Sequence, residues 1–501
     1  MTGTMAPWVE VTGYVVPPEV RLGVTEAGAV LVRDGRAIAL RLTPRGRQLL
    51  GAISSGGPAS DPLAVPADPA RAALLEQIAR CGFLRRQWRA REEALPTVAL
   101  IVPAFRRPKL VKRCLAAVRH LDYPAHLMET IVVDDASGDG GVTARVAAEA
   151  GARVVARRVN GGPAAARDSG ISASRSDLLA FLDTDCVVDS KWLLRLVLEL
   201  ADPGVAAVAC RVRTVPAFDS LSLFEAERSP LDMGLVFGDL DARGPNFFCP
   251  TANFVMRRAA YERCGGFSTN MRVGEDVDLC LRLIEGGWRV RYVPDPLVIH
   301  QTPRSPLEMA RRRFVYGRSE PSLWERHPVT RQGIQTSLPR AGACLAMIAA
   351  SRRGAVIPCL ATAGSVFATQ QVTRSAGRRV LGRLGDPGFV LGRVTSVLTN
   401  LSRYHAATLL AGEFALRRSF PVFATTCLVG AAVCDYATLR SRVPVPSYLA
   451  LHALEDVAYS SGVVSGAVIR HAVLPGLGTG VRRRAAPQAT LGAGQRTSAR
   501  R

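Results

Sequence analysis

Phe181-Leu182-Asp183-Thr184-Asp185 is the stretch of sequence that decides the fold. The apolar run that ends at Leu182 predicts a buried strand, and acids two residues apart at its end project from the same face of the sheet edge. Two carboxylates placed in this way suit a divalent cation such as Mg²⁺ or Mn²⁺, which also uses substrate phosphates as ligands. A DxD pattern alone is common in loops, so its meaning depends on the sequence around it.

Strand-like and helix-like segments alternate on both sides of this stretch. Apolar runs predict strands at 98–102, 130–133, 153–156, 178–182 and 205–208, and helices are expected at 108–121, 141–150, 163–174 and 190–200. This alternation predicts an α/β domain with a parallel, doubly wound sheet and a ligand site at the carboxyl ends of its strands.

A second acid pair, Asp134-Asp135, follows the strand predicted at 130–133. Both acid pairs are therefore expected at the same edge of the sheet, where they would bring four carboxylates together. The alternative is that Asp135 and Ser137 only shape a turn and cap the next helix.

Composition limits the classes of function. The chain has 501 residues, 48% of them hydrophobic and 21% charged, which is typical of a globular protein. Its net charge of +22 would attract phosphates, nucleic acid or anionic lipid. Lysine occurs only three times, and aromatic residues are not interleaved with the arginines, so no nucleic-acid partner is expected. Eleven cysteines without a CxxC pair indicate neither a zinc site nor a disulfide framework.

Four regions are expected along the chain. Residues 1–90 form a small unit with two strands around Asp34-Gly35, helices at 43–50 and 69–80, and a loop at 56–69. The α/β domain occupies 96–325, a helical, apolar and arginine-rich region occupies 330–480, and a basic tail predicted to be disordered occupies 481–501.

The location of the chain follows from its apolar segments. The longest uncharged runs, 355–373 and 419–434, do not cleanly provide the roughly 20 apolar residues of a spanning helix, so buried or interfacial helices are expected. No signal peptide is recognisable in 1–17, so the cytoplasmic side is the expected location, with a membrane surface as a further partner of the C-terminal region.

Six motifs resemble those of the family-2 glycosyltransferases, whose fold is called GT-A, and they occur in the family's order. They are Val102-Pro103-Ala104-Phe105-Arg106, Asp134-Asp135, Asn160-Gly161-Gly162-Pro163 with Arg167, Asp183-Thr184-Asp185, Thr251-Ala252-Asn253-Phe254 and Gly274-Glu275-Asp276. The resemblance covers about 97–318. It implies a Rossmann-like nucleotide-diphospho-sugar transferase domain and an inverting transfer reaction.

The resemblance also implies a donor site. Its residues would be Pro103, Ala104, Arg106, Asp134, Asp135, Gly162, Arg167 and Asp183. Pro103, Ala104 and Asp134 would line the base and ribose, and Arg167 would approach the diphosphate, because guanidinium groups match phosphate oxygens in pairs. The family usually has Asn after this arginine, whereas this chain has Asp168.

Three further residues receive roles from the same resemblance. Asp276 would be the general base that deprotonates the acceptor hydroxyl, and Asp185 with His300 would bind the divalent cation. Other readings remain open: Glu275 as an ordinary helix-start acid, and His300 as a hydrogen-bonded structural residue. The arginines after the domain's last strand either clamp the diphosphate or form a solvated helix face: Arg311, Arg312, Arg313 and Arg318.

The whole chain is similar to a narrower group. A small N-terminal domain that resembles the winged-helix peptide chaperones, joined to a family-2 domain and an apolar C-terminal region, resembles the glycosyltransferases of mycofactocin biosynthesis. The stretch 455–463 is also similar to that group. The resemblance implies UDP-glucose or a similar UDP-sugar as donor, the peptide-derived redox cofactor precursor premycofactocin as acceptor, and β-linked glucose units added in succession.

Rival functions are less consistent with the sequence. A nucleotide-sugar pyrophosphorylase would need a glycine-rich phosphate loop where Val102-Pro103-Ala104-Phe105 stands, and a processive synthase would show Gln-x-x-Arg-Trp where Ala310-Arg311-Arg312-Arg313-Phe314 stands. The remaining alternative is a membrane-associated family-2 transferase that acts on a polyprenyl phosphate or a cell-envelope glycan.

Overall fold

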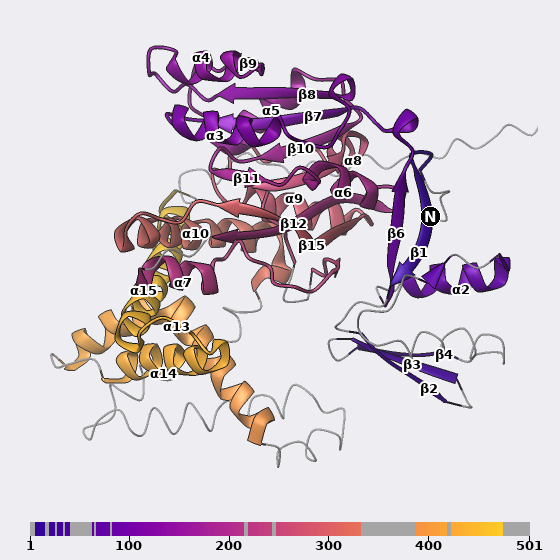
Figure 1. Ribbon diagram of the computed structural model, residues 1–501. Coiled ribbons are helices and arrows are strands. Elements are labelled where there is room, and N and C mark those ends of the chain that lie inside the picture. The colour runs from indigo at the N-terminus through magenta and orange to yellow at the C-terminus, as the bar shows by residue number, and fades with distance from the viewer. Residues whose placement is uncertain are drawn as a thin grey trace, which may run out of the picture.

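The computed structural model describes residues 6–15, 20–25, 28–33, 36–40, 63–64, 67–80, 83–214, 219–242, 247–331, 387–417 and 422–473. A central sheet with helices on both faces carries two small sheets near the N-terminus and a group of long helices near the C-terminus (Figure 1).

The central sheet follows the order β11-β15-β12-β14-β10-β7-β8-β9, with β13 paired to β15. Its strands are β7 (Val98–Ala104), β8 (Met128–Asp134), β9 (Arg153–Ala156), β10 (Leu178–Leu182), β11 (Cys186–Val188), β12 (Val205–Thr214), β13 (Gly238–Asp239), β14 (Asn253–Arg257) and β15 (Arg289–His300). All five strands predicted from apolar runs are present. The strands β10, β7, β8 and β9 pair in parallel, as predicted.

The other half of the sheet contains strands that were not predicted from the sequence, and some of them run antiparallel to their neighbours. Strand β14 runs antiparallel to both β10 and β12, and β11 runs antiparallel to β15. Strand direction could not be read from the sequence, because a strand buried on both faces is a continuous apolar run whichever way it points.

Alternate side chains of the central strands enter two separate cores. In β10, Leu178, Ala180 and Leu182 belong to one core, and Leu179 and Phe181 belong to the other. The first core is completed by α3 (Pro108–Val118), α4 (Val142–Glu149) and α6 (Trp192–Glu199), and the second by α5 (Pro163–Ser172), α8 (Arg258–Arg263) and α9 (Glu275–Glu285). The domain is therefore a three-layer α/β structure.

The N-terminal region forms two small sheets. One has the order β5-β1-β6 and the other β2-β3-β4, from strands β1 (Val9–Val15), β2 (Arg21–Thr25), β3 (Gly28–Arg33), β4 (Arg36–Leu40), β5 (Leu63–Ala64) and β6 (Arg85–Ala90). The antiparallel pairing of β3 with β4 confirms the predicted hairpin, and α2 (Pro69–Arg80) confirms the predicted helix at 69–80. The turn at 34–35 and the helix expected at 43–50 lie outside the described residues, and the winged-helix assignment stays a prediction.

Polar and aromatic contacts join this region to the central domain. The backbone N–H of Ala6 donates to the carbonyl of Ala201, and Arg86 lies 3.5 Å from Asp202. The Arg257 guanidinium lies 5.9 Å from the ring centre of Trp8. These contacts lie at the edge of the domain. The chain also contains three short 3-10 helices: η1 (Glu92–Ala94), η2 (Ala125–Leu127) and η3 (Pro328–Arg331).

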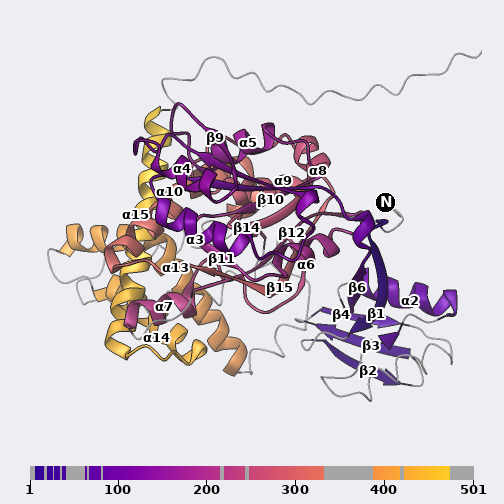
Figure 2. The same cartoon turned by 45° about the horizontal axis from the view of Figure 1, so that its top comes forward.

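Long helices pack beside the sheet at the other end of the chain (Figure 2). They are α10 (Pro306–Arg326), α13 (Pro387–Arg417), α14 (Val422–Leu439) and α15 (Val445–Val473), with the shorter α7 (Ser220–Arg228) beside them. Of the helices within the described ranges, none is long and apolar enough to cross a membrane. The apolar run at 355–373 and the tail at 481–501 are outside those ranges.

Helices α10 and α15 meet through glycines. A Cβ atom added to Gly317 would overlap the carbonyl oxygen of Tyr459, and one added to Gly462 would overlap that of Phe314. Beside this seam the buried Arg313 lies 2.7 Å from Glu225 and 2.7 Å from Glu455. The C-terminal helices are thus attached to the α/β domain by backbone contact and by buried ion pairs.

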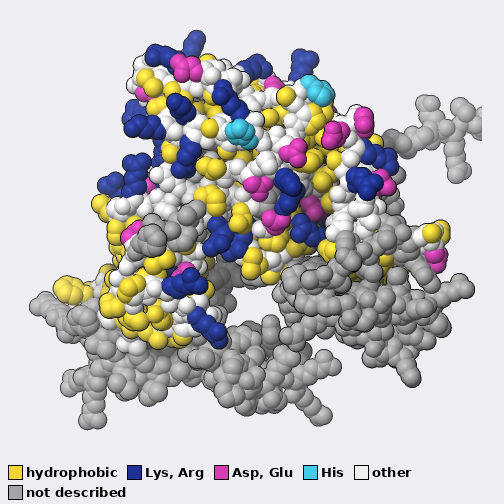
Figure 3. Space-filling model, viewed as in Figure 1, with side chains coloured by type: hydrophobic (Ala, Val, Ile, Leu, Met, Phe, Trp, Pro, Cys, Tyr) yellow, Lys and Arg dark blue, Asp and Glu magenta, His cyan; other side chains and the backbone are white. Residues whose placement is uncertain are grey.

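The basic charge is dispersed on the face of the molecule shown in Figure 3. Lys and Arg side chains lie among acidic and apolar ones there, rather than in a single stripe.

Candidate active site

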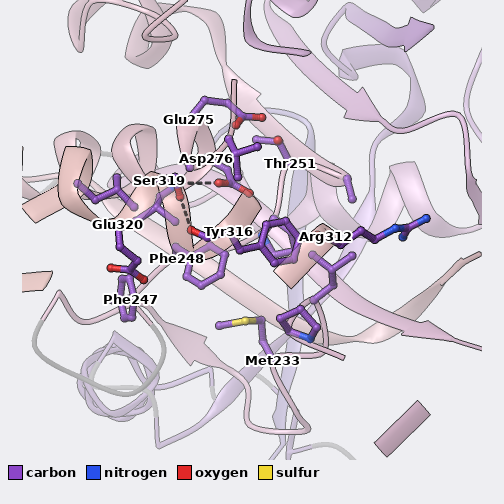
Figure 4. A pocket seen from close by; sticks show the side chains of 18 of the residues that line it. Met233, Phe247, Phe248, Thr251, Glu275, Asp276, Arg312, Tyr316, Ser319 and Glu320 are labelled. Atoms are coloured by element: carbon purple, nitrogen blue, oxygen red, sulfur yellow. Dashed lines mark hydrogen bonds between the residues drawn. The ribbon is translucent and has the colours of Figure 1, made fainter. Parts of the chain in front are cut away.

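A cavity of about 930 Å³ opens where β10 ends and α9 begins. Asp183, Asp185, Arg167, Asp276 and His300 all line it, so the structure brings together five of the residues singled out from the sequence. Figure 4 shows its interior, with Asp276 facing Ser319 of α10 and the Glu275 carboxylate directed away from α10.

Arg167 connects the two acidic motifs of the cavity. Its guanidinium donates to Asp183 Oδ1 at 2.7 Å and to Glu275 Oε1 at 2.8 Å. Burial lowers the pKa of Arg167, but the two carboxylates more than offset this, so its net pKa is raised and it stays charged. Its Nε atom is buried without a hydrogen-bond partner. As it stands, Arg167 orients Asp183 and Glu275, and a contact with a diphosphate stays a prediction.

Asp185 and His300 lie side by side because β11 pairs with the end of β15, where Cys186 is opposite His300. His300 Nε2 is 3.4 Å from Asp185 Oδ1, and Arg107 Nη1 is 3.1 Å from Asp185 Oδ2. Two atoms each about 2.1 Å from one ion can be at most about 4.2 Å apart, so this pair can contact a single small cation.

These two residues alone do not complete a metal site. Within the described parts of the chain there is no group of three or more His, Cys, Asp and Glu side chains that could hold an ion. The pair therefore fits a cation whose remaining ligands come from the substrate and water, which is how Mg²⁺ is commonly bound.

Asp276 is the second residue of α9 and faces the cavity. The backbone N–H of Val277 donates to Asp276 Oδ1 at 2.8 Å. Burial raises the pKa of Asp276, and burial with the charge of Asp276 raises the pKa of Glu275 to about 7. A carboxylate with a raised pKa is a stronger base, which suits proton abstraction near neutral pH.

The residues predicted to bind the nucleotide gather at the neighbouring ends of β7 and β8. Pro103 pairs with Val133 and Ala104 with Asp134 in the parallel register. Arg106 follows with a φ of 54°, a left-handed conformation that is uncommon outside glycine and is often found at functional sites.

The second acid pair does not line the cavity as the first one does. Asp134 accepts a hydrogen bond from the Ser137 N–H at 3.0 Å, and Asp135 accepts from the N–H groups of Gly161 and Gly162 at 3.0 and 2.8 Å. Gly162 has a φ of 85°. In the structure Asp135 thus holds the glycine turn before α5, in line with the turn-shaping alternative, and nucleotide contacts of Asp134, Asp135 and Gly162 remain predictions.

The structure resolves two details of the motif comparison. Asp168, which stands where the family usually has Asn, accepts a hydrogen bond from the Tyr261 hydroxyl at 2.8 Å, a structural contact. Among the arginines of α10, Arg312 lines the cavity, whereas Arg313 is buried between two glutamates.

The sequence analysis missed the wall formed by the C-terminal helices. Arg403 and Tyr404 of α13 and Glu455 and Tyr459 of α15 line the same cavity as Asp276. The available signal was the i, i+4 spacing of Glu455 and Tyr459 within an apolar helix, which places both on one face.

Comparisons with known proteins agree with this geometry. Residues 96–316 match the family model described as glycosyltransferase like family 2. A glycosyltransferase of Haloferax volcanii is 27% identical over 244 residues, 46% of this chain and 75% of that protein. The chain belongs to the family-2 glycosyltransferases, and it is an enzyme of that class.

One relative matches almost the whole chain. The pre-mycofactocin glycosyltransferase of Mycobacterium tuberculosis is 30% identical over 495 residues, 93% of this chain and 97% of that protein. A mannosyltransferase from Pyrobaculum calidifontis, solved in complex with GDP-Man and Mn²⁺, is 20% identical, with a TM-score of 0.39, over 60% of this chain and 87% of that one. That likeness is too distant to transfer its donor or its ion.

Proposed function

We propose that this glycosyltransferase moves a hexose, with glucose as the expected sugar, from a UDP-sugar to pre-mycofactocin with inversion of configuration. The observation that carries the proposal is the placement of Asp276 in one cavity with Asp183, Asp185 and His300. The acceptor is taken from the name of the relative that matches 93% of this chain.

The chemistry is a single in-line displacement. Asp276 accepts the proton of the acceptor hydroxyl while that oxygen attacks C1 of the sugar, and the nucleoside diphosphate leaves from the opposite face. Asp185 and His300 would hold a divalent cation, Mn²⁺ or Mg²⁺, which when bound neutralises charge on the leaving diphosphate. Arg167 keeps Asp183 and Glu275 in position through its two hydrogen bonds.

The N-terminal region is proposed to select the acceptor rather than take part in the chemistry. The cavity begins, in chain order, with Arg107, so none of its lining residues belongs to the described part of 1–90. The β2-β3-β4 sheet offers strand edges on which an extended peptide could pair. A folded chain beginning at Arg91 would then bind UDP but lose transfer to pre-mycofactocin, and transfer at the full-length rate would contradict this role.

The full-length protein can be tested with a panel of nucleotide sugars. It would be incubated with UDP-glucose, UDP-galactose and GDP-mannose, with and without Mn²⁺, and with either pre-mycofactocin or a polyprenyl phosphate as acceptor. We expect UDP-glucose and Mn²⁺ to give β-linked products on pre-mycofactocin, carrying one or several glucose units. Transfer only to the polyprenyl phosphate would replace the proposed acceptor.

A further inference from the structure

The C-terminal wall of the cavity consists of Arg403, Tyr404, Glu455 and Tyr459. It lines the same cavity as Asp276, and α10 packs against both α15 and α9. Helix α10 presents Arg312, Tyr316, Ser319 and Glu320 to the cavity at helical spacing, and its Gly317 contacts α15. Figure 4 shows Ser319 next to Asp276, whereas the Glu320 carboxylate is directed away from Asp276.

Arg403 differs from the other arginines that line the cavity. Each of those binds an oxygen of the protein: Arg107 to Asp185, Arg167 to Asp183, Arg228 to Glu455, Arg272 to Asn160 and Arg312 to Glu308. Arg403 makes no hydrogen bond or ion pair with any described residue, and its guanidinium lies over the ring of Tyr459 at 4.2 Å from the ring centre.

The acids around Arg403 are already engaged. Glu455 binds Arg313 at 2.7 Å and Arg228 at 3.1 Å, Glu320 accepts from the hydroxyl of Tyr459, and Asp456 accepts from that of Ser402. Burial lowers the pKa of Arg403, and Tyr459, Tyr404 and the acids offset this, so its net pKa is raised. The cavity therefore contains a permanent cation whose hydrogen-bond donors are not used within the described protein.

Two tyrosine rings lie beside this cation, and two phenylalanine rings line the same cavity. Tyr404 packs against Tyr459 with ring centres 6.1 Å apart, and Phe247 lies 5.3 Å from Phe248. Flat apolar faces with one fixed cation recognise a ring that carries a hydrogen-bond-accepting oxygen.

The position of the wall in the sequence points to the acceptor rather than the donor. The match to the family model covers residues 96–316 and therefore does not extend over α13 and α15. The groups that raise the pKa of Arg403 most belong to α13 and α15. On the side of the cavity where the donor is expected, Asp183 is bound by a different arginine, Arg167.

We propose that Arg403, Tyr404 and Tyr459 form the acceptor subsite of this enzyme, and that Arg403 binds a carboxylate or carbonyl oxygen of an acceptor that carries a flat ring. This inference rests on the proposed function only in calling the bound molecule an acceptor. Arg403 then determines acceptor specificity and takes no part in proton transfer.

The test uses the full-length protein and two small probes, benzoate and benzamide, with benzyl alcohol as the ring without a carbonyl. Binding would be measured by ligand-observed NMR for the wild type, Arg403→Gln and Arg403→Lys, and for Arg440→Gln as a matched control at an exposed arginine outside the cavity. We expect benzoate or benzamide to bind the wild type and the control, and to bind Arg403→Gln about tenfold or more weakly. Binding of benzoate alone, kept in part by Arg403→Lys, would assign a carboxylate, and equal binding of benzamide would assign a carbonyl.

A second measurement separates this inference from the proposed function. With UDP-glucose and pre-mycofactocin, Arg403→Gln should raise the acceptor KM about tenfold while UDP affinity stays the same. If the wild type does not use pre-mycofactocin, the proposed acceptor is wrong, and the probe binding still decides the role of Arg403. Equal probe binding by wild type and Arg403→Gln, or no binding of either carbonyl probe to the wild type, would overturn the inference.

Discussion

Replacement of Asp276 by Asn tests the centre of the proposed mechanism. The substitution preserves the shape of the side chain, and its amide oxygen can still accept the Val277 N–H bond of 2.8 Å. The hydrogen bonds of Arg167 to Asp183 and Glu275 do not involve residue 276. Only the proton-accepting group is lost, so kcat should fall by about 10²–10⁴-fold, which corresponds to about 3–5 kcal/mol in the barrier.

Three measurements distinguish this loss from damage to the site. UDP affinity, measured by calorimetry in Mn²⁺, should change by less than about twofold, or about 0.4 kcal/mol. Glu262→Gln, at an exposed position on α8, serves as the control and should keep full activity. The base must be deprotonated, and its pKa is raised, so wild-type kcat should fall as the pH drops through a value above the ordinary 3.8 of Asp. A variant with near wild-type kcat would refute the assignment of Asp276.

Three further substitutions test the surroundings of the site. Asp185→Ala should weaken UDP binding in Mn²⁺ but not in its absence, and equal calorimetric affinities of variant and wild type would remove Asp185 from the cation site. Arg313→Met removes the cation that binds the buried Glu225 and leaves the buried Glu455 with Arg228, so urea unfolding should show a loss of about 3–5 kcal/mol, and adding Glu225→Gln should restore part of it. Burial raises the pKa of Glu455, but the charges of Arg313, Arg228 and Arg403 lower it further, to a net value of about 2. The ionised Glu455 therefore stabilises the wild type above its unfolded pKa of about 4.3, and this stabilisation is lost as the pH falls toward 2. A free energy of unfolding that does not fall between these pH values would contradict the ion pairs assigned to Glu455. Gly462→Ala should force α15 away from α10 and raise the acceptor KM more than the donor KM, and unchanged values of both would show that the helix contact does not shape the acceptor side.

The sequence predicted elements whose signals are local. The hairpin of β3 and β4, the helix 69–80 and the alternation from β7 to β10 all follow from periodicity and turn residues within short windows. The strand pattern predicted Asp183 and Asp185 at the edge of the sheet, whereas Asp276 was assigned to the same site only by the family resemblance; all three line one cavity.

What the sequence did not predict depends on contacts between distant segments. The antiparallel direction of β14 and the C-terminal wall of the cavity involve partners far apart in the chain, and an apolar run carries no information about its partner. Asp168 was a departure without an explanation until its hydrogen bond with Tyr261 was seen. Arg403 stood out in no motif, because an arginine in an arginine-rich chain has no distinguishing local pattern.

The glycine contact between α10 and α15 has a consequence for engineering and for the evolution of this enzyme. The match to the family model ends at residue 316, immediately before Gly317 and in the middle of α10. A catalytic module cut at that border would interrupt the helix and leave Gly317 without the α15 backbone against which it fits. A chimera that takes its acceptor side from a relative would therefore need both α10 and α15 from that relative, because the glycines of each helix fit the backbone of the other.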